Sequence, residues 1–348
     1  MLGTMDLFAL TRKLIDIEST TGMEEEIGQR LAEELAQLGY QVERMPVESD
    51  RFNIWATQPG ASNPVLAFST HMDTVPPFIP SSETPERIYG RGACDAKGIM
   101  VAQIAAAERL KAEGIHAGLL FLVGEERDSQ GAQEANRQPR GTKFLINGEP
   151  TENRLALASK GTLRVELTAK GKMAHSAYPE LGESAIDKLL DVLQEVRKIK
   201  LPTHPQAGPS TLNIGILEGG RAPNVIPDFA RAHLLYRLIG PTNGLRAQIT
   251  AAAGDKAEAA FILEIPFMEM ATVPEIETMI AAFTTDVPVL TNWGKPLLIG
   301  PGSIHVAHTE GEYIEKQQLL GAVDLYVRIA RDLLQILVRR EAPGATLA

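Results

Sequence analysis

The chain is poor in cysteine and has no long apolar run. Cys94 is the single cysteine in 348 residues, which excludes an internal disulfide and fits a reducing compartment. No apolar run approaches the roughly 18 residues of a membrane-spanning helix. Charged residues such as Asp6, Arg12 and Lys13 interrupt the N-terminal segment, so that no signal-peptide core forms. We therefore expect a cytoplasmic protein that does not enter a membrane.

Positive charge is also scarce. The sequence has 34 Lys and Arg against 44 Asp and Glu, which gives a net charge of −10. Nucleic-acid binding needs a dense positive surface, and an acidic protein is repelled by anionic lipid. We therefore expect neither nucleic acid nor a membrane as a partner. At about 100–200 residues per domain, the length predicts two domains.

The N-terminal part alternates helical and strand patterns. Apolar residues recur at helical spacing over 7–17, and a capping box of Thr21 and Glu24 predicts a second helix that Gly39 ends. The remaining elements are expected to be buried strands at 65–68, 119–123 and 144–146 and a helix at 99–111. Apolar strands that alternate with helices predict an α/β domain with a mostly parallel sheet.

The pattern changes near residue 160. Leu163, Val165 and Leu167 alternate with polar residues, which is typical of a strand with one solvated face. We expect a helix at 184–198, strands at 212–217 and 229–238, a helix at 244–253 and a strand at 261–265. This βαββαβ order describes a small α+β domain. Residues 161–269 are therefore predicted to be an insertion in a discontinuous α/β domain of 1–160 plus 270–348.

Residues able to bind metal follow the predicted strands of the α/β domain. They are His71 and Asp73 after the first strand, Glu125 and Glu126 after the second, Glu149 after the third and His308 after a strand at 297–299, with Asp95 just before a helix. In open α/β sheets, functional groups collect beyond the carboxyl ends of the strands. Carboxylates crowded at one edge repel one another, and cations would remove that repulsion.

This set of ligands suits two zinc ions. Asp95 can bridge both ions, with His71 and Glu149 completing one site and Glu126 and His308 the other. Each ion then has three protein ligands and one open position, the pattern of catalytic zinc. Three carboxylates and a shared hydroxide balance the charge. Co²⁺ or Mn²⁺ could substitute, because ligands of this kind accept several divalent ions.

Two acids near these ligands are free for other roles. Asp73 lies two positions beyond His71 and can fix that imidazole. Glu125 precedes the ligand Glu126 and can serve as general base and then as general acid towards the leaving amine. The residues alone therefore point to hydrolysis by two metal ions.

Five blocks of the sequence resemble the two-zinc amidohydrolase and metallopeptidase family of acetylornithine deacetylase, succinyl-diaminopimelate desuccinylase, aminoacylase and glutamate carboxypeptidase. The blocks are Ser69–Pro76, Gly90–Gly98, Gly124–Glu126, Asn147–Thr151 and Gly300–Thr309, in the order of the family and over almost the whole chain. The resemblance favours His308 over His305 as the ligand. It also implies a cis peptide bond between Asp95 and Ala96.

The resemblance assigns roles to the inserted domain as well, as a lid and a dimerisation surface. His175 lies in a block similar to the one whose histidine reaches the active site of the partner subunit and polarises the scissile carbonyl. Asn224 falls in a segment that resembles the family's substrate loop, and Arg237 falls where the family keeps an arginine for the substrate carboxylate. A homodimer is therefore expected.

The function that we expect is metal-dependent hydrolysis of the amide bond of an N-acyl amino acid, of the acetylornithine or acetyllysine type. Desuccinylation, slightly favoured by the run Ala177–Pro179, and dipeptidase or carboxypeptidase activity on short peptides remain alternatives. A remote alternative is a non-catalytic binding protein with the same fold. Such proteins lose a ligand or the base, and this chain keeps them all.

Overall fold

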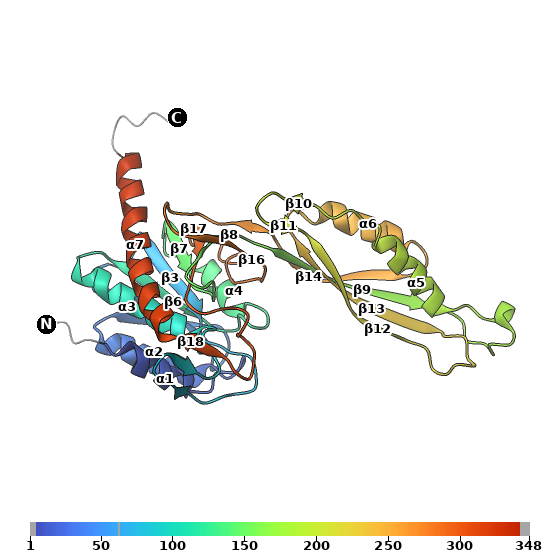
Figure 1. Cartoon of the computed structure of the whole chain (residues 1–348), viewed down its shortest axis with the longest axis horizontal. Helices are drawn as coiled ribbons and strands as arrows, with labels where there is room; N and C mark the ends of the chain where they lie inside the picture. The colour runs from blue at the N-terminus through green and yellow to red at the C-terminus, as the bar shows by residue number, and fades with distance from the viewer. Residues whose placement is uncertain (1–4, 62, 342–348) are drawn as a thin grey trace. The chain divides into compact units, whose positions relative to one another are not determined.

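The computed structural model describes residues 5–61 and 63–341, and the chain divides into two compact units. The first unit comprises Met1–Leu157, Met270–Met279 and Thr285–Ala348, and the second comprises Ala158–Glu269 and Ile280–Thr284. Figure 1 labels helices and strands of both units where there is room. Each unit has its own hydrophobic core.

The first unit is built on a six-stranded sheet. Its strands, in spatial order, are β1 (Gln41–Pro46), β2 (Phe52–Thr57), β6 (Ala117–Leu122), β3 (Leu66–His71), β7 (Phe144–Asn147) and β17 (Lys295–Leu298). The last four of these strands are parallel to one another, whereas β1 and β2 are antiparallel additions at one edge. The sheet is thus mostly parallel, as the sequence predicted, although the β1–β2 hairpin was not.

Helices lie on both faces of this sheet. They are α1 (Leu7–Ile15), α2 (Glu25–Gln37), α3 (Lys97–Ala112), α4 (Gln130–Arg137) and α7 (Lys316–Glu341). Alternate residues of the strands enter two separate cores: Phe121 packs with residues of α1, α2, α3 and α7, whereas Leu120 and Leu122 pack with those of α4 and with Trp293. Burial on both faces explains the continuous apolar runs of the parallel strands.

The start of α2 differs from the predicted capping box. The Thr21 hydroxyl donates a hydrogen bond to the Asp73 carboxylate at 2.8 Å, and the Glu24 carboxylate binds the Arg51 guanidinium through two hydrogen bonds of 2.7 Å. Neither side chain caps the helix, which begins at Glu25. A bidentate pair of charged groups is stronger than a neutral capping bond, and the buried Arg51 therefore takes the carboxylate.

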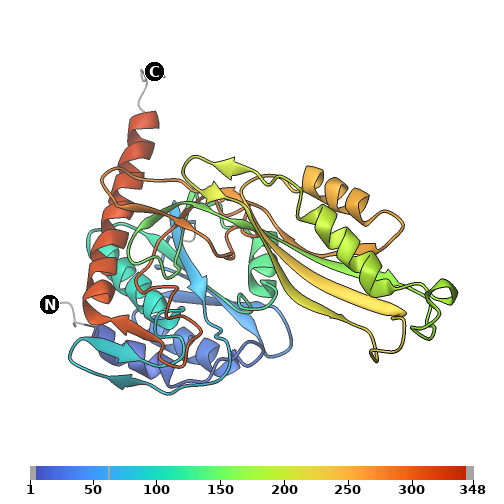
Figure 2. The same ribbon diagram turned by 45° about the vertical axis from the view of Figure 1, so that its right-hand side comes forward.

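The second unit contains the predicted βαββαβ order. Its elements are β9 (Gly161–Lys170), α5 (Ala185–Val196), β12 (Thr211–Gly219), β13 (Phe229–Leu238), α6 (Asn243–Ala253) and β14 (Glu258–Ile265). The strands form an antiparallel sheet in the order β12-β13-β9-β14, and both helices pack on one face of it (Figure 2). A short hairpin of β10 (Thr203–His204) and β11 (Gly208–Pro209) interrupts the order.

Two smaller sheets complete the described chain. One pairs β4 (Ser82–Glu83), β5 (Arg87–Tyr89) and β18 (Tyr313–Glu315), and the other pairs β8 (Leu155–Ser159) with β15 (Met268–Glu269) and β16 (Thr278–Ala281). A 3-10 turn, η1, covers Pro179–Leu181. Over 5–61 and 63–341, no helix combines the length and the apolar character needed to cross a membrane.

Candidate metal centre

The predicted ligands all lie in the first unit, at one edge of its parallel strands. His71 is the last residue of β3, and Glu149 follows β7 by two residues. After β6, Gly124 adopts a φ of 79°, a left-handed conformation suited to glycine, and turns the chain into Glu125 and Glu126. Because parallel strands end at the same edge, these side chains converge there.

Asp95 stands between two imidazoles. Its Oδ1 lies 3.0 Å from His71 Nε2, and its Oδ2 lies 3.3 Å from His308 Nε2. His308 Nε2 is also 2.9 Å from Glu126 Oε1. One ligand atom each from His71, Asp95 and Glu126 lie within 4.8 Å of one another. A carboxylate with one oxygen towards each imidazole has the arrangement expected of a bridging ligand.

Glu149 is a buried acid with one carboxylate oxygen that has no hydrogen-bond partner. The residue is only 4% exposed, and the unpartnered oxygen is Oε1. Burial raises the pKa of this carboxyl well above its usual range, and the nearby His71 only partly opposes that effect. Leaving a buried carboxylate unpaired costs about 1–3 kcal/mol or more, so a cation at this position would stabilise the fold.

The pKa values of both imidazoles are raised by the neighbouring carboxylates. Burial lowers the pKa of His71, but hydrogen bonds to Asp73 and Asp95 outweigh burial and leave it well above the usual value. Hydrogen bonds to Asp95 and Glu126 raise the pKa of His308 to about 10. Imidazole nitrogens and carboxylate oxygens are ligands that divalent transition ions accept, so this donor set fits two such ions.

Asp73 makes different contacts through its backbone carbonyl and through its carboxylate. His71 Nδ1 is 2.9 Å from the backbone carbonyl of Asp73, whereas the nearer carboxylate oxygen is 3.5 Å away. The carbonyl therefore orients the imidazole, with Nε2 facing Asp95. The Asp73 carboxylate instead accepts hydrogen bonds from the backbone N–H groups of Glu125 and Glu126 at 3.1 and 3.2 Å. It thus holds the turn that presents both glutamates.

Glu125 has the surroundings of an acid–base group. Burial, and next the charge of Glu149, raise the pKa of its carboxyl well above the usual range, while His71 opposes them. Among the residues that the structure describes, no Lys, Arg or His forms an ion pair with it, in contrast to Glu126. The peptide bond between Asp95 and Ala96 is cis, as the resemblance predicted.

Sequence reasoning missed one acid of this region. Asp286, between β16 and β17, is 1% exposed, and neither carboxylate oxygen has a hydrogen-bond partner of good geometry. Burial raises its pKa to about 7, although the Ser129 hydroxyl favours the ionised form. Its charge acts on both Glu125 and Glu149. An isolated acid within the apolar run 286–290 was the available signal, and it matched no block.

Of the two candidate histidines, His308 lies beside the other predicted ligands. His308 contacts Asp95 and Glu126, whereas the His305 ring has no hydrogen bond to either carboxylate. His308 has a φ of 64° and a side chain that is 48% exposed.

The remaining predicted residues lie in the second unit. His175 is exposed, and its Nδ1 accepts a hydrogen bond from the Ala177 N–H at 3.1 Å. The Asn224 carbonyl accepts one from the Ser176 N–H at 3.0 Å, which joins the predicted substrate loop to the segment that carries His175. The Arg237 guanidinium donates to the Thr162 hydroxyl at 2.7 Å and has no acidic partner within 5–61 and 63–341.

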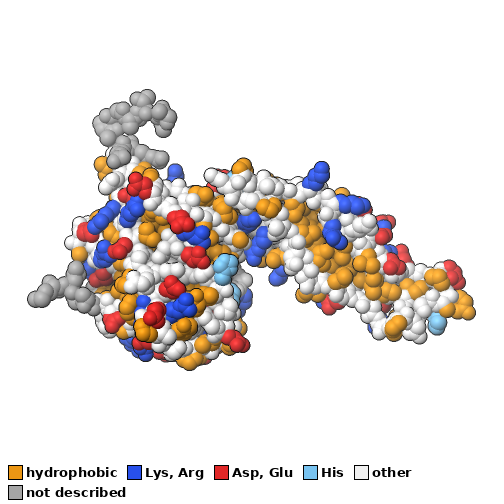
Figure 3. Space-filling model, viewed as in Figure 1, with side chains coloured by type: hydrophobic (Ala, Val, Ile, Leu, Met, Phe, Trp, Pro, Cys, Tyr) orange, Lys and Arg blue, Asp and Glu red, His pale blue; other side chains and the backbone are white. Residues whose placement is uncertain are grey.

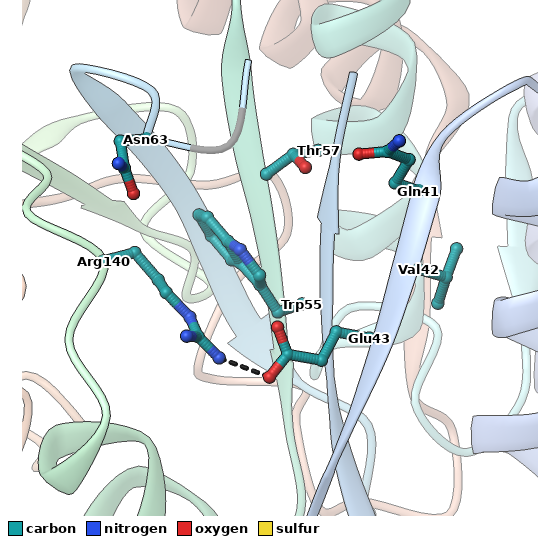
Figure 4. A pocket seen from close by; sticks show the side chains of 7 residues that line it. All are labelled: Gln41, Val42, Glu43, Trp55, Thr57, Asn63 and Arg140. Atoms are coloured by element: carbon teal, nitrogen blue, oxygen red, sulfur yellow. Dashed lines mark hydrogen bonds and ion pairs between the residues drawn. The ribbon is translucent and has the colours of Figure 1, made fainter. Parts of the chain in front are cut away.

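Two surface features do not belong to the metal centre. A pocket of about 260 Å³ beside β1 and β2 contains none of the predicted residues, and Arg140 there pairs with Glu43 (Figure 4). On the face shown in Figure 3, Lys and Arg are interspersed with Asp and Glu, without a continuous basic patch. That face gives no support to nucleic-acid binding.

Known proteins resemble this chain along most of its length. Residues 157–260 match the peptidase dimerisation domain family. A peptidase M20 domain-containing protein of Schizosaccharomyces pombe is 36% identical, covering 93% of this chain and 84% of its own length. A protein of Aspergillus fumigatus named a probable carboxypeptidase is 37% identical, covering 94% of this chain and 87% of its own length.

Solved structures share the fold. The aminopeptidase PepT of Bacillus cereus superposes with a TM-score of 0.80 at 21% identity, covering 94% of this chain and 98% of that chain. A dinuclear metal-binding peptidase of the M20 family from Bacillus subtilis has a TM-score of 0.71 at 14% identity, covering 94% of this chain and 98% of that chain. Taken with the sequence identity to the fungal proteins, these likenesses show that the chain belongs to the M20 family of metallopeptidases.

Proposed function

We propose that the protein hydrolyses, with two metal ions, the amide bond next to a free carboxylate in a small substrate. An N-acyl amino acid of the acetylornithine or acetyllysine type is the leading substrate. In this substrate the amide nitrogen is attached to a carbon that bears a free carboxylate. The C-terminal peptide bond that a carboxypeptidase cuts has the same arrangement. The observation that carries this proposal is Asp95 between the two imidazoles, with the unpaired Glu125 beside them.

His71, Asp95 and Glu149 would hold one ion, and Asp95, Glu126 and His308 the other. Two divalent ions, which we propose to be zinc, would supply Lewis-acid polarisation of the carbonyl and acidify water. Glu125 takes the proton of the attacking water and delivers it to the amine nitrogen as the C–N bond breaks. The Asp73 carboxylate keeps Glu125 and Glu126 in their separate positions.

Arg237 is the proposed receptor for the substrate carboxylate. A guanidinium pairs with a carboxylate through two parallel hydrogen bonds, and this one has no acid to neutralise it among the described residues. Burial lowers its pKa, as expected for a partly desolvated guanidinium with no counter-ion among the described residues. Relatives named probable carboxypeptidases support a substrate with a free carboxylate. Asn224, in the loop beside His175, is proposed as a further substrate contact.

We further propose that residues 161–269 are a lid and dimerisation domain, and that His175 serves the active site of the partner in a homodimer. Because Nδ1 accepts the Ala177 N–H, a neutral His175 ring carries its proton on Nε2 and can donate it to an oxyanion. The exposed apolar side chains around it, Met173, Tyr178 and Leu181, offer surface that a partner could cover. The match to the peptidase dimerisation domain supports a homodimer.

A substrate screen tests the proposed function. The purified protein with added zinc or cobalt is given N-acetylornithine, N-acetyllysine, N-succinyl-diaminopimelate and dipeptides, each beside its carboxamide analogue. We expect the free carboxylate to be required, with hydrolysis of an N-acetyl amino acid fastest. Preference for the succinylated substrate or for dipeptides would select the corresponding alternative. Equal rates on carboxylates and carboxamides would contradict the proposed role of Arg237.

A further inference from the structure

A buried ion pair lies next to the metal centre without belonging to the ligand set. Arg91 Nη1 is 2.6 Å from Glu312 Oε2, and the two side chains are 2% and 0% exposed. Removing two such charges from water costs several kcal/mol per ion. Replacing a buried ion pair by apolar residues of the same size often leaves the protein equally stable. The other contacts of the pair suggest what it does here.

Glu312 holds the backbone beside the proposed bridging ligand. Its Oε1 accepts hydrogen bonds from the N–H groups of Cys94 and Asp95 at 3.2 and 3.3 Å. Its backbone carbonyl accepts a third from the Gly90 N–H at 3.1 Å. The turn that presents Asp95 is therefore fixed to a residue more than two hundred positions later in the sequence.

Arg91 reaches two further segments of the centre. Its Nη1 donates to the carbonyl of Thr309, the residue after His308, at 3.2 Å, and its Nε donates to the carbonyl of Pro77 at 3.3 Å. Pro77 lies in the loop that follows His71 and Asp73. The pair thus joins the segments that carry His71, Asp95 and His308.

Among the predicted ligands, His308 is the one whose position depends most on these backbone contacts. Its φ of 64° is a conformation that costs a non-glycine residue of the order of 1 kcal/mol or more, and its side chain is half exposed. Its distance from Asp95 and Glu126 therefore depends on the backbone at 309–312, which Arg91 and Glu312 attach to the Asp95 turn.

We propose that Arg91 and Glu312 act as a positioning pair, which sets the spacing of Asp95 and His308 and so the affinity of the ion held by Glu126 and His308. This inference rests on the two-metal arrangement of the proposed function, but not on any substrate. Both ions share Asp95, but the ion held by His71 and Glu149 keeps two ligands that β3 and β7 place, so it depends less on the pair.

The test is calorimetric titration of the metal-free protein with zinc, for the wild type, Glu312→Gln and Arg91→Lys. Residues that orient metal ligands typically contribute about 10–100-fold in affinity, and we expect the weaker of two binding steps to lose that much. The tighter step, which we assign to the ion held by His71 and Glu149, should lose less affinity. Arg91→Lys keeps the charge but cannot bridge three carbonyl and carboxylate groups, so it remains informative if Glu312→Gln folds poorly.

Leu110→Ala is the matched control. Leu110 is fully buried at the far end of α3, the helix that follows Asp95, and its truncation lowers stability without touching the pair. Equal weakening of zinc binding in Leu110→Ala, or wild-type affinities in both pair variants, would overturn the positioning role. A wild type that binds no zinc would contradict the proposed two-metal function itself. Failure of the positioning role alone would leave zinc binding by the wild type intact.

Discussion

Glu125 and Glu126 are adjacent in sequence but have different surroundings. Glu126 contacts His308, whereas Glu125 has no ion pair among the described residues, and its pKa is raised by burial and by Glu149. This difference supports the proposed roles of Glu126 as a metal ligand and Glu125 as the acid–base group. The difference arises from the Asp73 carboxylate, which fixes both backbone N–H groups and so directs the two side chains apart.

Amide substitution separates these two roles. Glu125→Gln should keep the metal content of the wild type while kcat falls by about 10²–10⁴-fold, as expected for a lost general base. Glu126→Gln should lower metal occupancy. Metal content by elemental analysis and kcat on the best substrate are the measurements. If Glu125→Gln loses metal and Glu126→Gln keeps it, the two roles are reversed.

Asp286 should make the metal-free protein less stable as pH rises. Its pKa in the folded state is about 7 against 3.8 for an ordinary carboxyl, so the native state binds more protons than the unfolded state between these values. The free energy of unfolding then falls with pH across this window, by up to about 1.4 kcal/mol per pH unit for one group. Asp286→Asn should remove this contribution.

Denaturant unfolding between pH 4 and pH 8 in the presence of a chelator measures this effect. The wild type, measured under the same conditions, gives the reference slope. An unchanged slope in Asp286→Asn would show that Asp286 is ionised throughout.

For individual residues, the sequence predicts a metal ligand best where a residue able to bind metal follows an apolar strand. His71, Glu126 and Glu149 could be proposed as ligands on that ground alone. Asp286 and the Arg91–Glu312 pair could not, because their significance comes from burial and from partners far away in sequence.

At the scale of elements, the core strands were predictable because they are buried on both faces. β1 was not, since its residues are largely exposed and carry no clear alternation. Its partner β2 packs on the neighbouring β6 where Gly118 leaves room for the Trp55 ring: a Cβ at Gly118 would lie 2.1 Å from that ring.

Gly118→Ala should therefore destabilise the first unit. The added Cβ would overlap the Trp55 ring, and overpacking of a core costs typically about 1–3 kcal/mol. Gly321→Ala is the control: the glycine is in α7, its Cβ would have only an ordinary contact at 3.6 Å, and alanine in a helix stabilises by up to about 1 kcal/mol. Thermal unfolding of both variants tests this. If Gly118→Ala unfolds at the same midpoint as the wild type, the Trp55 ring moves aside without cost and the prediction is wrong.

At the scale of the whole molecule, the proposal requires a second copy of the chain. Exposed apolar side chains gather on the second unit (Figure 3), and they include Ile216 and Leu217 on the edge strand β12. If His175 serves the site of the partner, the inactive variants His175→Ala and Glu125→Gln should restore activity when they are mixed and allowed to exchange subunits. Random pairing gives one intact site in half of the dimers, or about a quarter of wild-type activity.

Each variant alone, taken through the same exchange, is the control. Full activity of His175→Ala alone, or no recovery on mixing, would refute the shared site while leaving the metal chemistry of the first unit untouched.

The central claim is that two metal ions at Asp95 make this protein a hydrolase. Its most direct test is exhaustive chelation followed by stepwise return of zinc, with hydrolysis and thermal midpoint followed together. We predict that chelation abolishes hydrolysis and lowers the midpoint, since an ion at 100 times its Kd adds about 2.7 kcal/mol to the native state. Both should recover as zinc returns, to completion at two ions per chain. Full turnover by the metal-free protein would contradict the account.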